Sequence, residues 1–417
     1  MVQLQRIAGA CLLTIVLLPT VATHAATYYV AVSGSNSNPG TETKPWRTVA
    51  YAVTTMAAGD TTYVRGGTYD EGLIRFKVSG TPSAPIKLLN YPGESPTISC
   101  ISAAQFHRII LEHGSDSRTP IGWITIEGLE IRNCSEAIKL NAAHDVTIRS
   151  NWIHDNGHGM LGNGTRILVD RNRINHNGQF AKCAAEAANG DINSTCTKDH
   201  GLYAHGTAWT ITNNLFYDNL AFGIQMNGTK IYNPSKHPGP EYVLSHNWVV
   251  ANNTLAYQRY AGGMVIWGAS CHNARIENNI FYENAQTRPS HVNQGIHFTS
   301  MTCTGVVIRN NLVYASEPGG TGFLGSGANE WVHYTQSGNI VNASPPALAN
   351  APATIPDSPS FSLTGRSPAI DAGVTNTAVK IAFDGTPRPQ GRAFDIGAYE
   401  FRDNEQGPAA PKALQAR

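Results

Sequence analysis

The segment KDHGLYAH, residues 198–205, places several proton-transferring side chains close together in the chain. His200 and His205 flank Tyr203, and Lys198 precedes all three. An imidazole can accept a proton near neutral pH without a large pKa shift, and a phenol can donate one. A further histidine, His158, stands before a glycine as His200 does. These five residues are therefore candidates for a catalytic site that works by general acid–base chemistry.

An asparagine-centred motif recurs between about residues 120 and 315. The copies are IRSNWIHDN (148–156), VDRNRINHN (169–177), ITNNLFYDN (211–219), IENNIFYEN (276–284) and IRNNLVYAS (308–316), with a looser copy, VANNTLAYQ, around residue 253. Their central asparagines, at positions 151, 172, 214, 253, 279 and 311, lie 21 residues apart at the closest. That distance fits one turn of a solenoid, and the longer ones fit a turn plus a loop or an insertion.

Upstream of each asparagine lies a short segment with strand-like alternation of apolar residues. The segments are AIKLN (137–141), GMLGN (159–163), GLYAH (201–205), GIQMN (223–227), GMVIW (263–267) and GIHFT (295–299). Such short strands cannot bury a core alone and must stack on their neighbours. We therefore predict an all-β fold, a parallel β-helix, in which the asparagines form a structural ladder at one corner because asparagine tolerates left-handed backbone.

The two ends of the chain differ from the repeats. Residues 27–69 predict a strand, a loop, an amphipathic helix around Trp46 to Met56 and another strand. The helix is expected to cap the open end of the β-helix, whose edge would otherwise be unpaired. The β-helix domain is expected over 26–401, with a C-terminal cap over about 345–401 and a disordered tail over 402–417.

Residues 1–25 predict a secretory signal peptide. Arg6 precedes the apolar run from Ile7 to Val21, and small residues follow around Ala25. A membrane anchor is the alternative, but the run is shorter than the roughly 20 residues that a span needs.

Only 14% of residues are charged, with 30 basic against 29 acidic, so nothing favours nucleic-acid binding. We expect an exported monomer, extracellular or periplasmic, that neither spans a membrane nor binds nucleic acid.

Six cysteines remain after removal of the signal, an even number that fits an oxidising compartment. Cys271 and Cys303 occupy the same position on consecutive repeats, so they should lie close enough for a disulfide. Cys183 and Cys196 bracket an insertion and are expected to close it. Cys100 and Cys134 then pair by elimination. No CxxC motif points to structural zinc.

Three groups of motifs carry a family resemblance. The N-terminal YYVAVSGSNSNPGTETKPWRTVAYAV with AAGDTTYVRGGTY, the N-x-[IFL]-x-x-N repeats, and the closing SPAIDAG and DIGAYEF resemble the secreted right-handed parallel β-helix proteins around the pectate-lyase-like and other polysaccharide-lyase families. The resemblance spans about residues 27–401. It implies a right-handed β-helix, but its activities range over uronate lyases, uronan epimerases, glycoside hydrolases and members of unknown function. Calcium-using lyases of this group gather several aspartates, often as an adjacent pair, and this sequence contains no DD. No motif therefore supports a calcium site or the transfer of catalytic residues from those enzymes; calcium stays open as an alternative, and no cofactor is predicted.

Stacking the repeats places outward-facing residues in columns. The first column is Lys139, Leu161, Tyr203, Gln225, Val265 and His297, the second is Asn141, Asn163, His205, Asn227, Trp267 and Thr299, and the corner before them holds Glu136, His158, His200, Phe222, Gly262 and Gln294. Tyr203 and His205 thus share one face. The structural alternative is that a corner histidine only bonds the backbone of the next repeat, and that Lys139, Trp267 and His297 are ordinary surface residues.

The chemistry that fits this face is β-elimination on a uronic-acid polymer, with His200 or His205 as base and Tyr203 as acid. Lys139, Lys198, Asn163, Gln225 or Asn227 would steady the substrate carboxylate, Trp267 with Tyr203 would stack on sugar rings, and His297 lies at the periphery. The insertions around 179–199 and 228–246 are expected to wall a cleft for a polysaccharide.

Other functions stay open at this point. A uronan C5-epimerase shares the proton abstraction. A glycoside hydrolase needs two facing carboxylic acids, and the outward columns contain none, although Glu136, Asp155 and Asp199 border them. A non-catalytic glycan-binding or cell-surface β-helix would use every repeat as scaffold. A transition metal bound by three histidines lacks carboxylates at ligand spacing, so we predict no metal.

Overall fold

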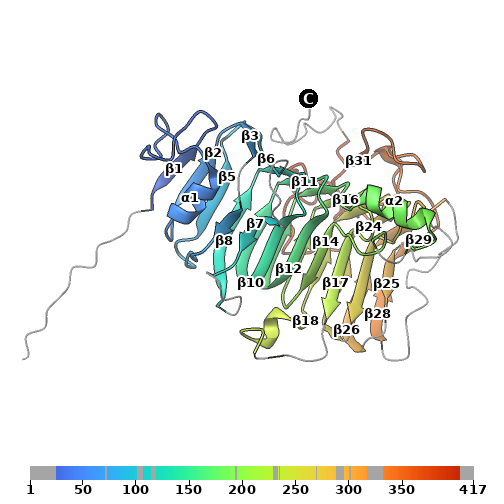
Figure 1. The fold of residues 1–417 in the computed structure, drawn as a ribbon. Coiled ribbons are helices and arrows are strands. Elements are labelled where there is room, and N and C mark those ends of the chain that lie inside the picture. Colours follow the sequence, from blue (N-terminus) through green and yellow to red (C-terminus); the bar gives the residue numbers. More distant parts are fainter. Residues whose placement is uncertain are drawn as a thin grey trace, which may run out of the picture.

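The computed structural model describes residues 25–70, 73–100, 107–113, 119–192, 195–228, 233, 235–268, 270–287, 295–299, 302–316 and 332–403. These residues wind into a parallel β-helix, in which strands from successive coils stack side by side along the molecule (Figure 1). The predicted signal peptide and C-terminal tail lie almost wholly outside the described residues. No helix among the described residues is long and apolar enough to cross a membrane.

Three faces make up the β-helix. The first consists of β4 (Ile74–Phe76), β7 (His107–Leu111), the first halves of β10 (Glu136–Arg149) and β12 (His158–Asp170), β14 (Leu202–His205), β17 (Ile224–Gly228), β21 (Met264–Gly268) and β25 (Ile296–Phe298). The second consists of β1 (Thr27–Val30), β2 (Thr61–Val64), β5 (Ile86–Asn90), β8 (Ile121–Glu127), the second halves of β10 and β12, β15 (Thr210–Thr212), β19 (Val249–Ala251), β23 (Arg275–Glu277), β26 (Thr302–Arg309) and β28 (Val332–Ser337).

The third face is a separate sheet. It contains β3 (Gly67–Asp70), β6 (Pro96–Ser99), β9 (Glu130–Arg132), β11 (Trp152–His154), β13 (Arg173–Asn175), β16 (Leu215–Tyr217), β20 (Thr254–Ala256), β24 (Ile280–Tyr282), β27 (Leu312–Tyr314) and β29 (Ile340–Val341). Short strands β18 (Ser245–His246) and β22 (Ser270–His272) lie between the first and second faces, and β30 (Leu348–Asn350) pairs antiparallel with β31 (Ser360–Leu363) in the C-terminal region.

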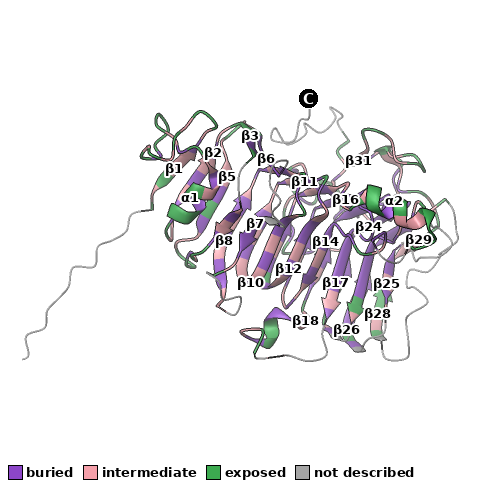
Figure 2. Cartoon of the chain, in the orientation of Figure 1, coloured by how far each residue is buried: buried purple, intermediate pink, exposed green. Residues whose placement is uncertain are grey.

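The predicted alternation places apolar side chains inside the coil. Leu202 and Ala204 of β14 are buried, whereas Tyr203 and His205 are partly exposed. Figure 2 shows the same pattern of buried and less buried positions across the stacked strands. The interior residues form one continuous apolar cluster from Val30 to Val313. The fold therefore holds outward side chains of neighbouring coils at fixed spacing, about 4.8 Å from strand to strand.

The asparagine ladder is confirmed inside the corner between the second and third faces. The side-chain amide of Asn151 donates to Asn172 at 3.0 Å, Asn172 donates to Asn214 at 3.0 Å, and the series continues through 253, 279 and 311 to Asn339. A second ladder, at the end of the third face, was not predicted. It contains Asn156, Asn177, Asn219, Gln258 and Asn284.

The predicted N-terminal helix is present as α1 (Val49–Thr55), with Thr48 as its N-cap. It buries Val49, Ala52 and Val53 in the same apolar cluster as the first coils, at the blue end of Figure 1. The insertion after residue 179 was expected to be a loop but contains a helix, α2 (Phe180–Ala188). Its alanine-rich sequence favours a helix.

All three predicted disulfides are formed. Cys271 and Cys303 lie opposite each other on β22 and β26, with Cα atoms 4.6 Å apart. Cys183–Cys196 closes the α2 insertion, and Cys100–Cys134 joins two neighbouring coils.

Candidate functional site

A cavity of about 220 Å³ opens on the first face, over β10, β12 and β14. Its lining residues are Lys139, Asn141, Leu161, Gly162, Asn163, Tyr203, His205, His237 and Val243. A cavity of about 640 Å³ in the C-terminal cap contains Asp371 and Asp395, whose carboxylates accept backbone N–H groups of the cap itself. The smaller cavity is therefore the candidate site, because it alone of these two contains the predicted acid and base.

Strand register brings the cavity residues together. Lys139 pairs with Leu161 and Leu161 with Tyr203, as the first outward column predicts. Asn163 pairs with His205 in the second column. The register shifts after Leu140, where β10 bends round the corner. Gly162 faces this bend with φ +143°, and a Cβ there would lie 2.1 Å from the carbonyl oxygen of Leu140, so only glycine fits.

His205 is the best-placed candidate base. Burial, with His237 and Lys139 nearby, lowers the pKa of its imidazole to about 4. The ring is therefore neutral at neutral pH and carries a lone pair that can accept a proton. The side-chain nitrogen of Asn227 lies 3.3 Å from both ring nitrogens and can donate a hydrogen bond to the unprotonated one.

Tyr203 lies beside His205, with ring centroids 5.3 Å apart in an edge-to-face arrangement. Burial raises the pKa of its phenol, so the group stays protonated well above neutral pH. Its hydroxyl makes no hydrogen bond with any residue that the structure describes. The cavity therefore holds a neutral imidazole and a protonated phenol as neighbours.

Lys139 supplies a cation to the same cavity. Burial lowers the pKa of its ammonium group, and the charges of Glu136 and Glu112 only partly offset this effect. Among the described residues no carboxylate forms an ion pair with it. Glu112 instead accepts a hydrogen bond from Asn141 at 3.0 Å and lies 3.6 Å from Arg75.

The 228–246 insertion walls the cavity through His237 and Val243. The amide of Asn163 lies 3.4 Å from Nδ1 of His237, and its oxygen accepts the backbone N–H of Ala142 at 2.7 Å. A 3-10 turn at Pro240–Tyr242 holds this segment, where Thr207 donates its backbone N–H to Glu241. His237 was not among the predicted site residues, although it is the single histidine between residues 229 and 245.

His200 and His158 do not reach the cavity. His200 is buried, and its Nδ1 accepts the backbone N–H of Phe222 at 3.2 Å. Burial, with His158 nearby, holds the pKa of His200 well below its ordinary value. His158 accepts the backbone N–H of His200 and faces Asp199 at 3.3 Å. Both histidines therefore make the backbone contacts of the structural alternative.

The remaining predicted residues lie around the cavity without lining it. Lys198 is exposed beyond the corner. Gln225 is buried beside Tyr203 on the next coil. Trp267 is 52% exposed and pairs with Asn227 in the second column. His297 pairs with Val265 and is half-buried near Phe222. Of the predicted residues, the structure thus gathers Lys139, Asn163, Tyr203 and His205 in one cavity, with Asn227 at its edge.

The cavity does not fit a calcium ion. Calcium prefers carboxylate and carbonyl oxygens, six to eight in number. Among the described residues, no carboxylate lines this cavity, and no cluster of three histidine, cysteine or acidic side chains is suited to a metal ion.

Comparison with known proteins places this architecture in a family. The model of the Pel9A-like right-handed β-helix region matches residues 28–264, which is more than half of the chain and includes every cavity residue. The chain belongs to the Pel9A-like right-handed β-helix family. The predicted fold and handedness are thereby confirmed.

Two curated relatives match shorter stretches. Pectate lyase PEL9 of Emericella nidulans is 44% identical over 75 residues, 18% of this chain and 18% of the relative. The uncharacterized protein YwoF of Bacillus subtilis is 37% identical over 105 residues, 25% of this chain and 22% of the relative. The matches thus span about a fifth of each relative. A solved rhamnogalacturonan lyase shares the fold at TM-score 0.51 and 14% identity, covering 82% of this chain and 97% of the other.

Proposed function

We propose that this member of the Pel9A-like family is an exported polysaccharide lyase that cleaves a uronate-containing glycan by β-elimination. One observation carries the proposal: one cavity on the outer face is lined by a neutral imidazole, a protonated phenol and an ammonium that has no ion-pair partner among the described residues. The names of the pectate lyase and rhamnogalacturonan lyase relatives agree with this reaction class.

The reaction divides among three side chains. Lys139 binds the uronate carboxylate, which favours the negative charge that develops beside it. His205 removes the proton from the carbon next to the carboxylate. A carbon–carbon double bond then forms, the bond to the glycosidic oxygen breaks, and Tyr203 protonates that oxygen. Solvent returns the proton from His205 to Tyr203 after the products leave.

The surroundings support a polymeric substrate. Asn163 and Asn227 lie in the same outward column as His205. Trp267, exposed on the coil after Asn227, offers a ring on which a sugar can stack. Glycoside hydrolysis is less well supported, because no carboxylic acid is found among the described lining residues of the cavity. Three disulfides support export to an oxidising compartment.

A panel of uronate polymers tests the proposal. Purified protein should generate ultraviolet absorbance from unsaturated uronate products on at least one polymer. No such absorbance on any uronan, together with reducing ends released from a neutral glycan, would overturn the lyase assignment. Exchange of solvent deuterium into an uncleaved uronan would instead identify an epimerase.

A further inference from the structure

The candidate cavity contains one ammonium group and a histidine that can gain a proton when an anion binds. Lys139 lines it, and the inserted segment adds His237, next to the exposed Lys236. The lining residues that the structure describes include no carboxylate to balance a positive charge there. Glu136 and Glu112 act on Lys139 only from outside the cavity, and Glu112 is engaged with Asn141 and Arg75. An anion entering the cavity would therefore meet the Lys139 ammonium, with which no carboxylate of the described residues forms an ion pair.

The same arrangement disfavours a divalent cation. A bound calcium or magnesium ion needs several oxygen donors, mostly carboxylates, to offset its charge. Here the polar atoms at the cavity wall are an ammonium, two imidazoles, a phenol and the amides of Asn141 and Asn163. Burial, with His237 and Lys139 nearby, already lowers the pKa of His205, which shows that positive charge is unfavourable at this point.

We infer that the cavity binds a glycan carboxylate directly, through the Lys139 ammonium with His237 as a second cationic group, and uses no divalent cation as a bridge. The identity of the anion as a uronate rests on the proposed function. The two groups come from different elements, Lys139 from β10 and His237 from the inserted segment, so a sugar ring can be held between the coil and its wall.

Proton uptake on binding is a specific consequence. Burial, with Lys236 nearby, lowers the pKa of His237 in the free protein. The amide of Asn163 lies 3.4 Å from Nδ1 of His237, and the charge of His237 acts on His205 in the same cavity. A bound carboxylate favours the charged imidazole, so the pKa of His237 should rise. Binding near pH 6 should therefore take up protons, an effect that a purely structural histidine would not produce.

Binding can be measured without turnover. The full chain carrying Tyr203→Phe is titrated by calorimetry with polygalacturonate, polymannuronate and polyglucuronate, and with their carboxyl-reduced forms. Each titration is made in EDTA and in calcium chloride, and in two buffers of different ionisation enthalpy. We expect at least one polyuronate to bind equally with and without calcium, with proton uptake, and its neutral form to bind at least tenfold more weakly.

Variants test which side chains bind the glycan carboxylate. Lys139→Met should weaken polyuronate binding by about tenfold or more, whereas Lys139→Arg, which keeps the charge, should retain most of it. The exposed Lys87 of β5 gives the matched control Lys87→Met, with unchanged affinity expected. His237→Gln should weaken binding and abolish proton uptake.

Three results would overturn the inference: binding that requires calcium, equal affinity of wild type and both Lys139 variants, or no binding of any polyuronate. Its failure is distinguishable from failure of the proposed function. Binding in EDTA without unsaturated product would remove the lyase assignment alone. Unsaturated product formed only with calcium would support the lyase assignment and contradict direct binding of the carboxylate by Lys139.

Discussion

Burial shifts the candidate acid and base in opposite directions. It lowers the pKa of His205 to about 4, aided by His237 and Lys139, and it raises the pKa of Tyr203. Between these values one ring can accept a proton while its neighbour, 5.3 Å away, can donate one. The pair is thus set for proton transfer across the whole neutral range.

Removing either group should abolish most of the activity. His205→Gln and Tyr203→Phe are each expected to lower kcat on a cleaved uronan by about 10²- to 10⁴-fold, the usual contribution of a general acid or base. Steady-state kinetics measures the loss, thermal unfolding confirms the fold, and Lys87→Met serves as a control. Full activity in the His205 variant would contradict its role as base.

The decline of kcat/KM at low pH should follow the protonation of His205. As the pH falls through about 4, the imidazole becomes protonated and loses its ability to act as base, so kcat/KM should decline. His237→Gln removes a positive neighbour, so the pKa of His205 should rise and the decline should move to higher pH. A decline that stays in place or moves to lower pH would show that another group is titrating.

Sequence periodicity located Tyr203 and His205 but could not separate them from His200. All three belong to the same repeat, and two-residue alternation does show that Tyr203 and His205 share the outward face. His200 lies at the corner before the strand, where alternation does not apply and the imidazole turns toward the backbone of the next coil. His237 lies in a non-repeating insertion, whose path depends on tertiary contacts rather than on a pattern.

At the scale of secondary-structure elements, buried amides hold the coils in register. Each asparagine of the first ladder accepts a hydrogen bond from the preceding coil and donates hydrogen bonds to backbone carbonyls. The amide of Asn214, for example, donates to the carbonyls of Val169 and Thr212 at 2.9 Å. Loss of one rung leaves several buried polar groups unpaired.

Asn214→Ala should therefore lower the free energy of unfolding by about 3 kcal/mol or more, because it breaks a fully buried network. Asn339→Ala, at the partly exposed end of the ladder, should cost less. Urea unfolding measures both changes. Equal, small effects at the two positions would show that the ladder contributes little to stability.

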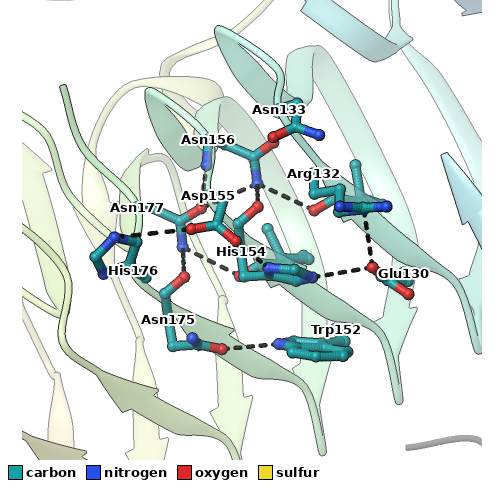
Figure 3. A network of polar contacts seen from close by, with 12 residues as sticks. Glu130, Arg132, Asn133, Trp152, His154, Asp155, Asn156, Asn175, His176 and Asn177 are labelled. Carbon is teal, nitrogen blue, oxygen red and sulfur yellow. Dashed lines mark hydrogen bonds and ion pairs between the residues drawn. The ribbon is translucent and has the colours of Figure 1, made fainter. Parts of the chain in front are cut away.

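A polar network on the third face links four successive coils, and Figure 3 labels residues of the first three. His154 bonds Asp155 at 2.6 Å and Glu130 at 3.2 Å, and His176 bonds Asp218 at 2.8 Å. Burial lowers the pKa of His154, but the carboxylates of Asp155 and Glu130 raise it by more, so the pKa of His154 lies above its ordinary value. The hydrogen bond to Asp218 raises the pKa of His176, and the bond from His154 lowers that of Asp155.

The signs of these shifts define a pH window. Histidines with raised pKa stabilise the fold fully below about pH 6.5, the unfolded value, and lose this effect as the pH rises through the folded values. Asp155, with a lowered pKa, stabilises above about pH 4 and loses its effect as the pH falls further. Asp155→Asn should therefore lower Tm more at about pH 5 than at about pH 9, with the exposed Asp357→Asn as control. A loss of Tm that does not depend on pH would contradict this coupling.

At the scale of the whole molecule, the sequence was informative wherever structure repeats. The β-helix, its first asparagine ladder and the Cys271–Cys303 disulfide follow from coil-to-coil spacing, since stacked positions are neighbours in space. The other two disulfides were predicted from the insertion that one of them closes and by elimination. The second ladder was not predicted, although four copies of the motif end in its asparagines; the fifth member, Gln258, replaces asparagine in the looser copy. The helix α2 and the antiparallel pair β30–β31 lie in segments without a repeat.

The proposed function requires cleavage by elimination rather than by hydrolysis. The masses of the products formed in water enriched in heavy oxygen distinguish these two reactions most directly. β-Elimination transfers no oxygen from water, so each cleavage should yield one ordinary oligosaccharide and one lighter by a water molecule, neither carrying solvent oxygen. Hydrolysis gives two products of ordinary composition, one of which carries heavy oxygen. The first pattern is expected if Lys139, Tyr203 and His205 catalyse elimination. The second pattern would contradict the lyase assignment.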